Sequence, residues 1–118
     1  MDGTNAVTWT RVLGLVGLGI RGRLAVVGVE RVREAARKGT LYLALVAPDA
    51  SRHSREKVLR LLAAKGVPVL EGASTATLGG AAGRDATAVI GIVDAQLAKG
   101  IRGIAEAVVR ESAQERMV

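Results

Sequence analysis

Residues 41–47 are apolar at every position, and segments with the apolar spacing of helices lie on both sides of them. A strand that is apolar on both sides of its pleat is typical of a sheet covered by helices on each face. Further apolar runs at 24–27, 67–71 and 86–93 alternate with helical patterns in the same way. This alternation predicts an α/β fold, a three-layer α/β/α sandwich with a central sheet of about four strands.

The segments between these runs have the caps and the apolar spacing of helices. We expect helices over residues 8–18, 29–38, about 51–65, 74–82 and from 94 onward. The first helix is expected to end at Gly19, and Gly100 and Gly103 are expected to kink or split the last one. Pro68 donates no amide hydrogen, so its strand is expected to begin at or lie on an edge of the sheet.

The length of 118 residues fits a single domain over 1–118, with an expected folded core over 8–110 and frayed ends that include 112–118. No apolar stretch approaches the roughly 20 residues of a membrane span, and the N-terminus lacks the positive segment of a signal peptide. We therefore expect a cytoplasmic protein without a membrane partner. The absence of cysteine and the single histidine exclude disulfides and thiolate or multi-histidine metal sites, so we expect no metal and no cofactor.

The formal net charge is +6, and all of the excess lies in the first half of the chain. Residues 1–60 carry eleven basic and five acidic side chains, whereas residues 61–118 carry six of each. A local basic excess attracts phosphate backbones, although a solvated surface has the same composition. One Trp, one Tyr and no Phe leave little on which single-stranded bases could stack, so a nucleic-acid partner is expected to be structured rather than single-stranded.

Two glycine-rich stretches have the letters of phosphate-binding motifs without their context. Residues 17–22 match G-x-G-x-x-G, but that motif needs a strand before it and a long helix after it, whereas a strand is expected over 24–27. Residues 78–83 are not followed by the Lys-Ser/Thr pair of a P-loop. We interpret the first stretch as a helix end and the second as a tightly packed short helix. Nucleotide binding remains the least favoured alternative function.

Asp49, Ser51 and His53 lie close together in the sequence. The members of a catalytic triad, however, converge from different elements, with the histidine bridging the other two. We therefore expect Asp49 and Ser51 to cap helices or bond to the backbone, and His53 to be a solvated side chain. No residue is predicted to be catalytic, and the protein is not expected to be an enzyme.

A basic helix over residues 29–38 follows a glycine turn at Gly28. A helix N-terminus offers unpaired amides to phosphate, and arginine adds bidentate contacts to phosphates and guanine edges. Arg21 and Arg23 lie just upstream of the same turn. We interpret this stretch as a nucleic-acid-binding element rather than as a solvated amphipathic helix.

Several segments have a familiar order and spacing. They are Leu13-Gly14-Leu15, Gly22-Arg23-Leu24, the helix from Gly28 to Gly39, the run 41–47 with Asp49-Ala50-Ser51, Ser54 and Lys57, Val67-Pro68-Val69, residues 78–83, and 88–93 with Asp94. In this order they resemble the superfamily of ribosomal proteins L7Ae and L30e, and within it the bacterial YlxQ-type proteins. The resemblance covers about residues 11–97.

The resemblance implies a protein that binds structured, kink-turn-like RNA and associates with rRNA or the ribosome, with ribosomal proteins as further partners. In the superfamily, the turn after the first strand and the start of the second helix enter the RNA. The loop before the last strand makes the second contact. The residues expected to contact RNA are Arg21, Arg23, Gly28, Val29, Glu30, Arg31, Arg33, Glu34, Arg37, Lys38, Arg84, Asp85 and Ala86.

The kink-turn readers of the superfamily carry Asn or Lys, then Glu or Gln, then Lys along a motif led by Gly-Thr. By position these are Glu30, Arg31 and Glu34 here, with Val29 in place of Thr. A glutamate repels phosphate, although it accepts a hydrogen bond from a base edge. The two glutamates also suit a protein-interaction module of the same fold, which is the main alternative function.

Overall fold

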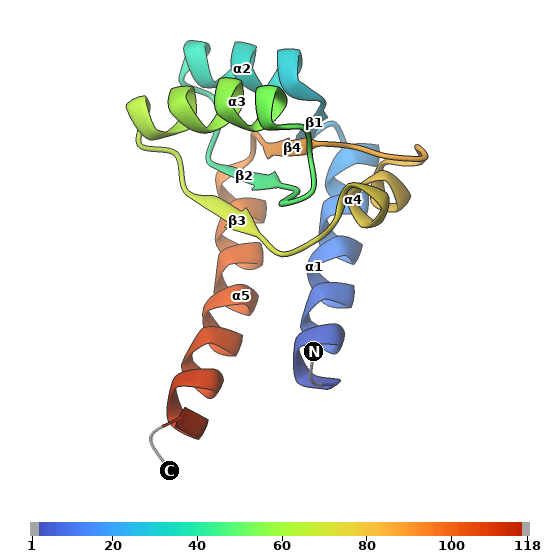
Figure 1. Ribbon diagram of the computed structural model, residues 1–118, viewed down its shortest axis with the longest axis vertical. Helices are drawn as coiled ribbons and strands as arrows, with labels where there is room; N and C mark the ends of the chain where they lie inside the picture. The colour runs from blue at the N-terminus through green and yellow to red at the C-terminus, as the bar shows by residue number, and fades with distance from the viewer. Residues whose placement is uncertain (1–2, 117–118) are drawn as a thin grey trace.

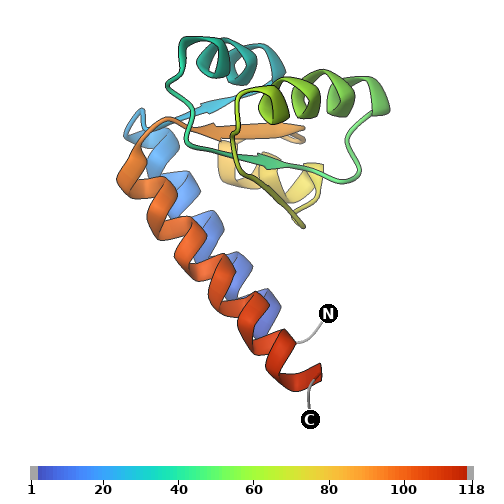
Figure 2. The same ribbon diagram turned by 90° about the vertical axis from the view of Figure 1, so that its left-hand side faces the viewer.

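The computed structural model describes the backbone of residues 3–116 and the side chains of residues 9–106. Its elements follow the predicted alternation (Figure 1). They are α1 (Gly3–Arg21), β1 (Ala25–Val27), α2 (Val29–Lys38), β2 (Leu43–Val46), α3 (Arg52–Ala64), β3 (Val69–Glu71), α4 (Thr75–Ala82), β4 (Val89–Ile92) and α5 (Ala95–Arg116). Helices α2 and α3 cover one face of the sheet and α1, α4 and α5 cover the other, which confirms the three-layer sandwich (Figures 1 and 2).

The sheet is mixed, with the strand order β1-β4-β2-β3. Strand β4 is antiparallel to both β1 and β2, whereas β2 and β3 are parallel. Strands β1, β2 and β3 therefore point the same way and β4 points the opposite way. Strand β3 begins after Pro68 and lies on an edge of the sheet, which confirms the prediction made from that proline.

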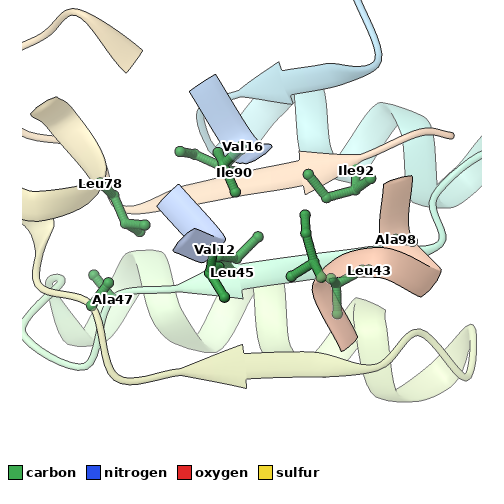
Figure 3. Close-up of a cluster of buried hydrophobic side chains, with 11 residues drawn as sticks. Val12, Val16, Leu43, Leu45, Ala47, Leu78, Ile90, Ile92 and Ala98 are labelled. Carbon is green, nitrogen blue, oxygen red and sulfur yellow. The ribbon is translucent and has the colours of Figure 1, made fainter. Parts of the chain in front are cut away.

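Alternate residues of β2 enter two separate hydrophobic cores. Leu43 and Leu45 point toward α1 and α5, where they pack with Val12 and Val16 (Figure 3). Ala44 and Val46 instead contribute to the core beneath α2 and α3. All four residues of the strand are buried, so the burial on both faces that the apolar run predicts is confirmed.

Two predictions about the long helices are wrong for the same reason. Helix α1 continues past Gly19 to Arg21, and α5 runs unbroken through Gly100 and Gly103. The two helices pack side by side beneath the sheet, and such packing outweighs the low helix propensity of glycine (Figure 2). Gly19 is buried at this contact, where a Cβ would collide with Leu97. Glycine is therefore a packing residue here rather than a stop signal.

Other boundaries differ by a few residues. Helix α1 begins at Gly3, before the predicted start at residue 8, and each strand lies inside its predicted run. Helix α5 continues to Arg116, so the predicted fraying is wrong for residues 112–116, and residues 117–118 lie outside the described chain.

Candidate nucleic-acid interface

The starts of three helices and of one strand meet at one end of the sheet, beyond the C-terminal ends of β1, β2 and β3. Strands β1, β2 and β3 point the same way, so α2, α3 and α4, which follow them, all begin beyond the same strand ends (Figure 2). Strand β4 runs in the opposite direction, so the loop before it reaches the same place. We call this surface the helix-start edge and define it by residues 28–31, 49–52, 74–75 and 84–87.

Backbone hydrogen bonds hold these segments together. They run from the amides of Gly28, Ala47 and Thr87 to the carbonyls of Val89, Ala88 and Thr75, at 3.0, 2.9 and 3.0 Å. Strand β4 therefore begins beside the turn before α2, and the loop before it rests on the start of α4. The two RNA-contacting segments that the resemblance implies, at the start of α2 and over 84–86, are brought to one surface.

Gly28 makes the turn at which α2 begins. Its φ of 101° and ψ of 158° are costly for a residue with a Cβ. Because glycine has no side chain to cap the helix, the first amides of α2 stay available to a partner. A Cβ built at Gly28 would meet no atom of the described part of the chain within 4 Å, so this turn is open. Val29 beside it is half-buried and packs on the core below α2, so it offers its backbone rather than its side chain.

Both glutamates of α2 are paired within the helix. Arg33 lies 3.5 Å from Glu30, and Lys38 lies 2.8 Å from Glu34. The hydrogen bond from Lys38, together with its charge, lowers the pKa of Glu34 below its usual value. Arg31 is exposed and makes no ion pair with any other described residue. The glutamates therefore neutralise neighbouring cations and leave Arg31 free near Gly28.

The loop over residues 84–86 rests on Gly79 of α4. The amide of Arg84 donates to the carbonyl of Gly79 at 2.8 Å, and a Cβ on Gly79 would come within 2.8 Å of the backbone of Ala86. Arg84, Asp85 and Ala86 are exposed, and neither charged side chain makes an ion pair with the described residues. The missing side chain of Gly79 thus sets the position of this loop.

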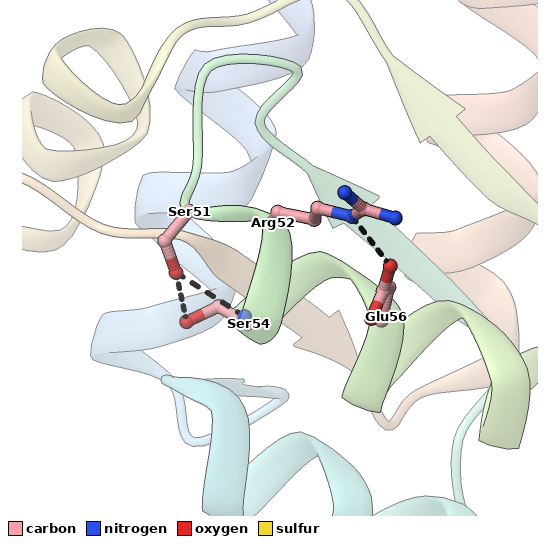
Figure 4. A network of polar contacts seen from close by, with 4 residues as sticks. All are labelled: Ser51, Arg52, Ser54 and Glu56. Atoms are coloured by element: carbon pink, nitrogen blue, oxygen red, sulfur yellow. Dashed lines mark hydrogen bonds and ion pairs between the residues drawn. The ribbon is translucent and has the colours of Figure 1, made fainter.

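Helix α3 begins at the same edge under a serine cap. The hydroxyl oxygen of Ser51 accepts from the amide of Ser54 at 3.2 Å and the hydroxyl donates to the Ser54 hydroxyl at 2.9 Å (Figure 4). In the same turn Arg52 pairs with Glu56 at 2.9 Å (Figure 4). His53 is exposed, so the expected capping and solvated roles of this segment are confirmed.

Asp49 ties the loop after β2 to the start of α4. One carboxylate oxygen accepts the amide of Thr75 at 2.8 Å, and the other accepts the Thr75 hydroxyl at 2.9 Å. The bond from the backbone amide, followed by that from the hydroxyl, lowers the pKa of Asp49 below its usual value. The expected hydrogen-bonding role of Asp49 is therefore confirmed, with a partner 26 residues away.

This link predicts a pH-dependent contribution of Asp49 to stability. Because the pKa is lower in the folded protein, the contribution is complete above the unfolded value of about 3.9 and is lost as the pH falls through the folded value. Wild type should melt at a higher temperature than Asp49→Asn near neutral pH, and the gap should close in strong acid. Thermal melts across this range measure the gap. A gap that stays constant down to the lowest pH would contradict the link.

Four other cationic residues expected to contact RNA lie at the opposite edge. Arg21 and Arg23 lie between the end of α1 and the start of β1, and Arg37 and Lys38 lie at the end of α2. Helix α2 has ten residues, so about 15 Å separates its two ends. Adjacency in sequence therefore does not place the upstream arginines beside Gly28. Arg33 and Glu34 lie midway along α2 and belong to neither end.

The glycine motif of residues 17–22 lies in the last turns of α1 and the residue after it. The dinucleotide motif requires a strand before its glycines and a helix start after them, where amides face the phosphate. Here the glycines end a helix, so the geometry contradicts the nucleotide-binding alternative at this position. Within residues 3–116, no helix is long and apolar enough to cross a membrane. The described side chains also contain no group of three or more His, Asp or Glu residues placed to hold a metal ion.

Comparison with known proteins gives both a family match and structural neighbours. Residues 19–102, which include the residues of the helix-start edge, match the ribosomal protein L7Ae/L30e/S12e/Gadd45 family. A Bacillus halodurans protein of unknown function has 29% identity and a TM-score of 0.74, over 80% of this chain and 96% of that one. A Giardia lamblia 15.5kD RNA binding protein has 25% identity and a TM-score of 0.71, over 91% of this chain and 98% of that one. No curated protein matches. With most of its length in the match, the chain belongs to the ribosomal protein L7Ae/L30e/S12e/Gadd45 family.

Proposed function

We propose that this protein binds structured RNA through its helix-start edge. The observation that carries the proposal is the open turn at Gly28, where the uncapped amides of α2 lie at the same end of the sheet as the exposed loop 84–86. Arg31 adds a cation without an ion pair to the start of α2, and Arg84 adds one to the loop 84–86. Amides at a helix start and arginine side chains both bind phosphate oxygens. The similarity to the Giardia RNA-binding protein supports the same function.

The distribution of aromatic residues favours structured RNA over single strands. The aromatic side chains of the chain are Trp9 and Tyr42. Trp9 packs against the core below the sheet, and Tyr42 lies before β2 at the edge opposite Gly28. Trp9 lies against Gly72 but is half-buried, so the helix-start edge offers little aromatic surface on which unpaired bases could stack. Recognition through the backbone and shape of a folded RNA fits this surface better.

Glu30 suits a contact with a base rather than with a phosphate. Its side chain is 74% exposed at the start of α2, and Arg33 holds it only at 3.5 Å. A cytosine or adenine amino group could displace that weak pairing, because carboxylates accept hydrogen bonds from base amino groups. This supports a kinked RNA that exposes base edges as the target. The finer assignments proposed with it are a non-enzymatic, YlxQ-type role in the cytoplasm on rRNA or the ribosome, with ribosomal proteins as further partners.

Binding of the wild-type protein to a panel of RNAs tests this function. A kink-turn RNA, other folded RNAs and single strands of equal length are compared by fluorescence anisotropy over a salt series. We expect the folded RNAs to bind more tightly than the single strands, and their affinity to fall several-fold as salt rises. If no RNA binds at low salt, the proposal is wrong and the protein-interaction alternative gains support.

A further inference from the structure

A second group of cations lies at the edge of the sheet opposite Gly28. We call it the helix-end edge and define it by Arg21, Arg23, Arg37 and Lys38. All four side chains are exposed, and among the described residues only Lys38 makes an ion pair, with Glu34. Asp94, which follows the end of β4 at this same edge, accepts the amide of Leu97 at the start of α5. The helix-end edge therefore carries an uncompensated positive charge.

A shallow hollow along α2 joins this edge to the helix-start edge. It has a volume of about 520 Å³, and Val26, Ala35 and Val93 are among the residues that line it. Arg31 lines the hollow near the start of α2, and Lys38 and Thr40 line it near the end. The amide of Val93 donates to the carbonyl of Leu24 at 2.9 Å, which brings Arg23 next to the same end of the hollow. Cations thus stand at both ends of this flank, and Glu34, which pairs with Lys38, lines the hollow between them.

Arg23 has a backbone conformation that would favour glycine. Its φ is 63°, and it is the one non-glycine residue with positive φ in the described part of the chain. It ends α1 in a left-handed turn, in which the amide of Leu24 reaches back to the carbonyl of Gly19 at 2.7 Å. Glycine is the usual residue at this position because a Cβ is strained there. An exposed arginine in this strained conformation, without an ion pair to a described residue, points to a role other than stability.

We propose that the helix-end edge is a second phosphate-binding surface, which holds a further segment of the RNA bound at the helix-start edge. This rests on the proposed function. Arginine is suited to the contact because its guanidinium binds phosphate oxygens in a bidentate way. The two edges are about 15 Å apart along α2, so an RNA with one short element would reach the first edge only. An RNA with long flanking helices would reach both.

A triple variant, Arg21→Gln with Arg23→Gly and Arg37→Gln, tests the second surface. The probe is a kink-turn RNA made with short or with long flanking helices. For the long RNA we expect about tenfold weaker binding and a salt slope that is lower by about two to three, since three phosphate contacts are lost. For the short RNA the affinity should stay close to that of wild type. The matched control, Arg11→Gln with Lys57→Gln and Arg60→Gln, removes the same charge from other exposed positions.

Arg23→Gly alone separates a binding role from a structural one. Because glycine relieves the left-handed strain, its melting temperature should equal that of wild type or exceed it by about 2–4 °C, while its affinity for the long RNA falls. If Arg23→Gly lowers the melting temperature, Arg23 is a structural residue and its assignment to the surface is wrong.

The remaining outcomes are decisive as well. The second surface is disproved if the triple variant binds both RNAs as wild type does, or if the control loses as much affinity for the long RNA. A triple variant that binds RNA as wild type does but loses binding to phosphatidylserine vesicles also disproves the second phosphate-binding surface for RNA. That result would indicate a lipid-binding surface instead. If a variant of the helix-start edge, Arg31→Glu with Arg84→Glu, loses binding to the short RNA in these same cases, the proposed function stands without the second surface. If wild type binds neither RNA, both proposals fail together.

Discussion

Replacing Gly79 with alanine is expected to lower the free energy of unfolding by about 2 kcal/mol and to weaken RNA binding as well. A Cβ at this position would lie 2.8 Å from backbone atoms of Ala86 and from the carbonyl oxygen of Arg84. Backbone atoms cannot rotate aside as the end of a side chain can, so the loop 84–86 must move. Chemical denaturation measures the loss of stability, and anisotropy with a folded RNA measures the loss of affinity.

The neighbouring glycine provides the matched control for this prediction. Gly80 lies in the same helix, and a Cβ there would meet no described atom within 4 Å. Alanine is a better helix former than glycine by about 1 kcal/mol, so Gly80→Ala should stabilise the protein and leave RNA binding unchanged. Equal stability of the Gly79 and Gly80 variants would show that the loop does not rest on Gly79.

Reversing two charges at the helix-start edge is expected to weaken binding to a folded RNA about 100-fold. Arg31→Glu with Arg84→Glu replaces the free cation on each of the two contact segments by an anion. The loss of two charge-assisted contacts, each of about 1.5 kcal/mol, accounts for that factor, because 1.4 kcal/mol is a tenfold change in affinity. Both residues are exposed, so the melting temperature should change little.

The same charge reversal elsewhere distinguishes a local contact from a general field. Arg60→Glu with Lys99→Glu changes the net charge equally, on the outer surface of α3 and on α5. We expect this control to lose only a few-fold in affinity at physiological salt, where surface charges farther than about 8 Å are screened. An equal loss in the two double variants would remove the case for a contact at the helix-start edge.

The layers of the fold were predictable because a strand buried on both faces is apolar at every position. The run 41–47 has this pattern, and β2 lies at the centre of the sheet between two helical layers. The antiparallel direction of β4 was not predictable, since its residues are buried on both faces and read the same in either direction. Yet this direction is what carries the loop 84–86 to the start of α2.

The site was predictable in its segments but not in their arrangement. Gly28 and the loop 84–86 both lie at the helix-start edge, whereas the length of α2 carries Arg37 and Lys38 to the helix-end edge. A count of charges along the chain does not show that residues at the two ends of one helix lie far apart in space. The pairing of Glu34 with Lys38, in contrast, was already present in the i,i+4 spacing. That spacing signals that the glutamates neutralise cations within α2 instead of forming an acidic patch.

Amide chemical shifts of the protein, recorded with and without the short kink-turn RNA, test the helix-start edge most directly. The account predicts that the largest changes fall on residues 28–31 and 84–87, with smaller changes at the starts of α3 and α4. Residues of α1 and the middle of α5 should keep their shifts. Changes confined to α1 and α5, with none at Gly28 or in the loop before β4, would contradict RNA binding at this edge.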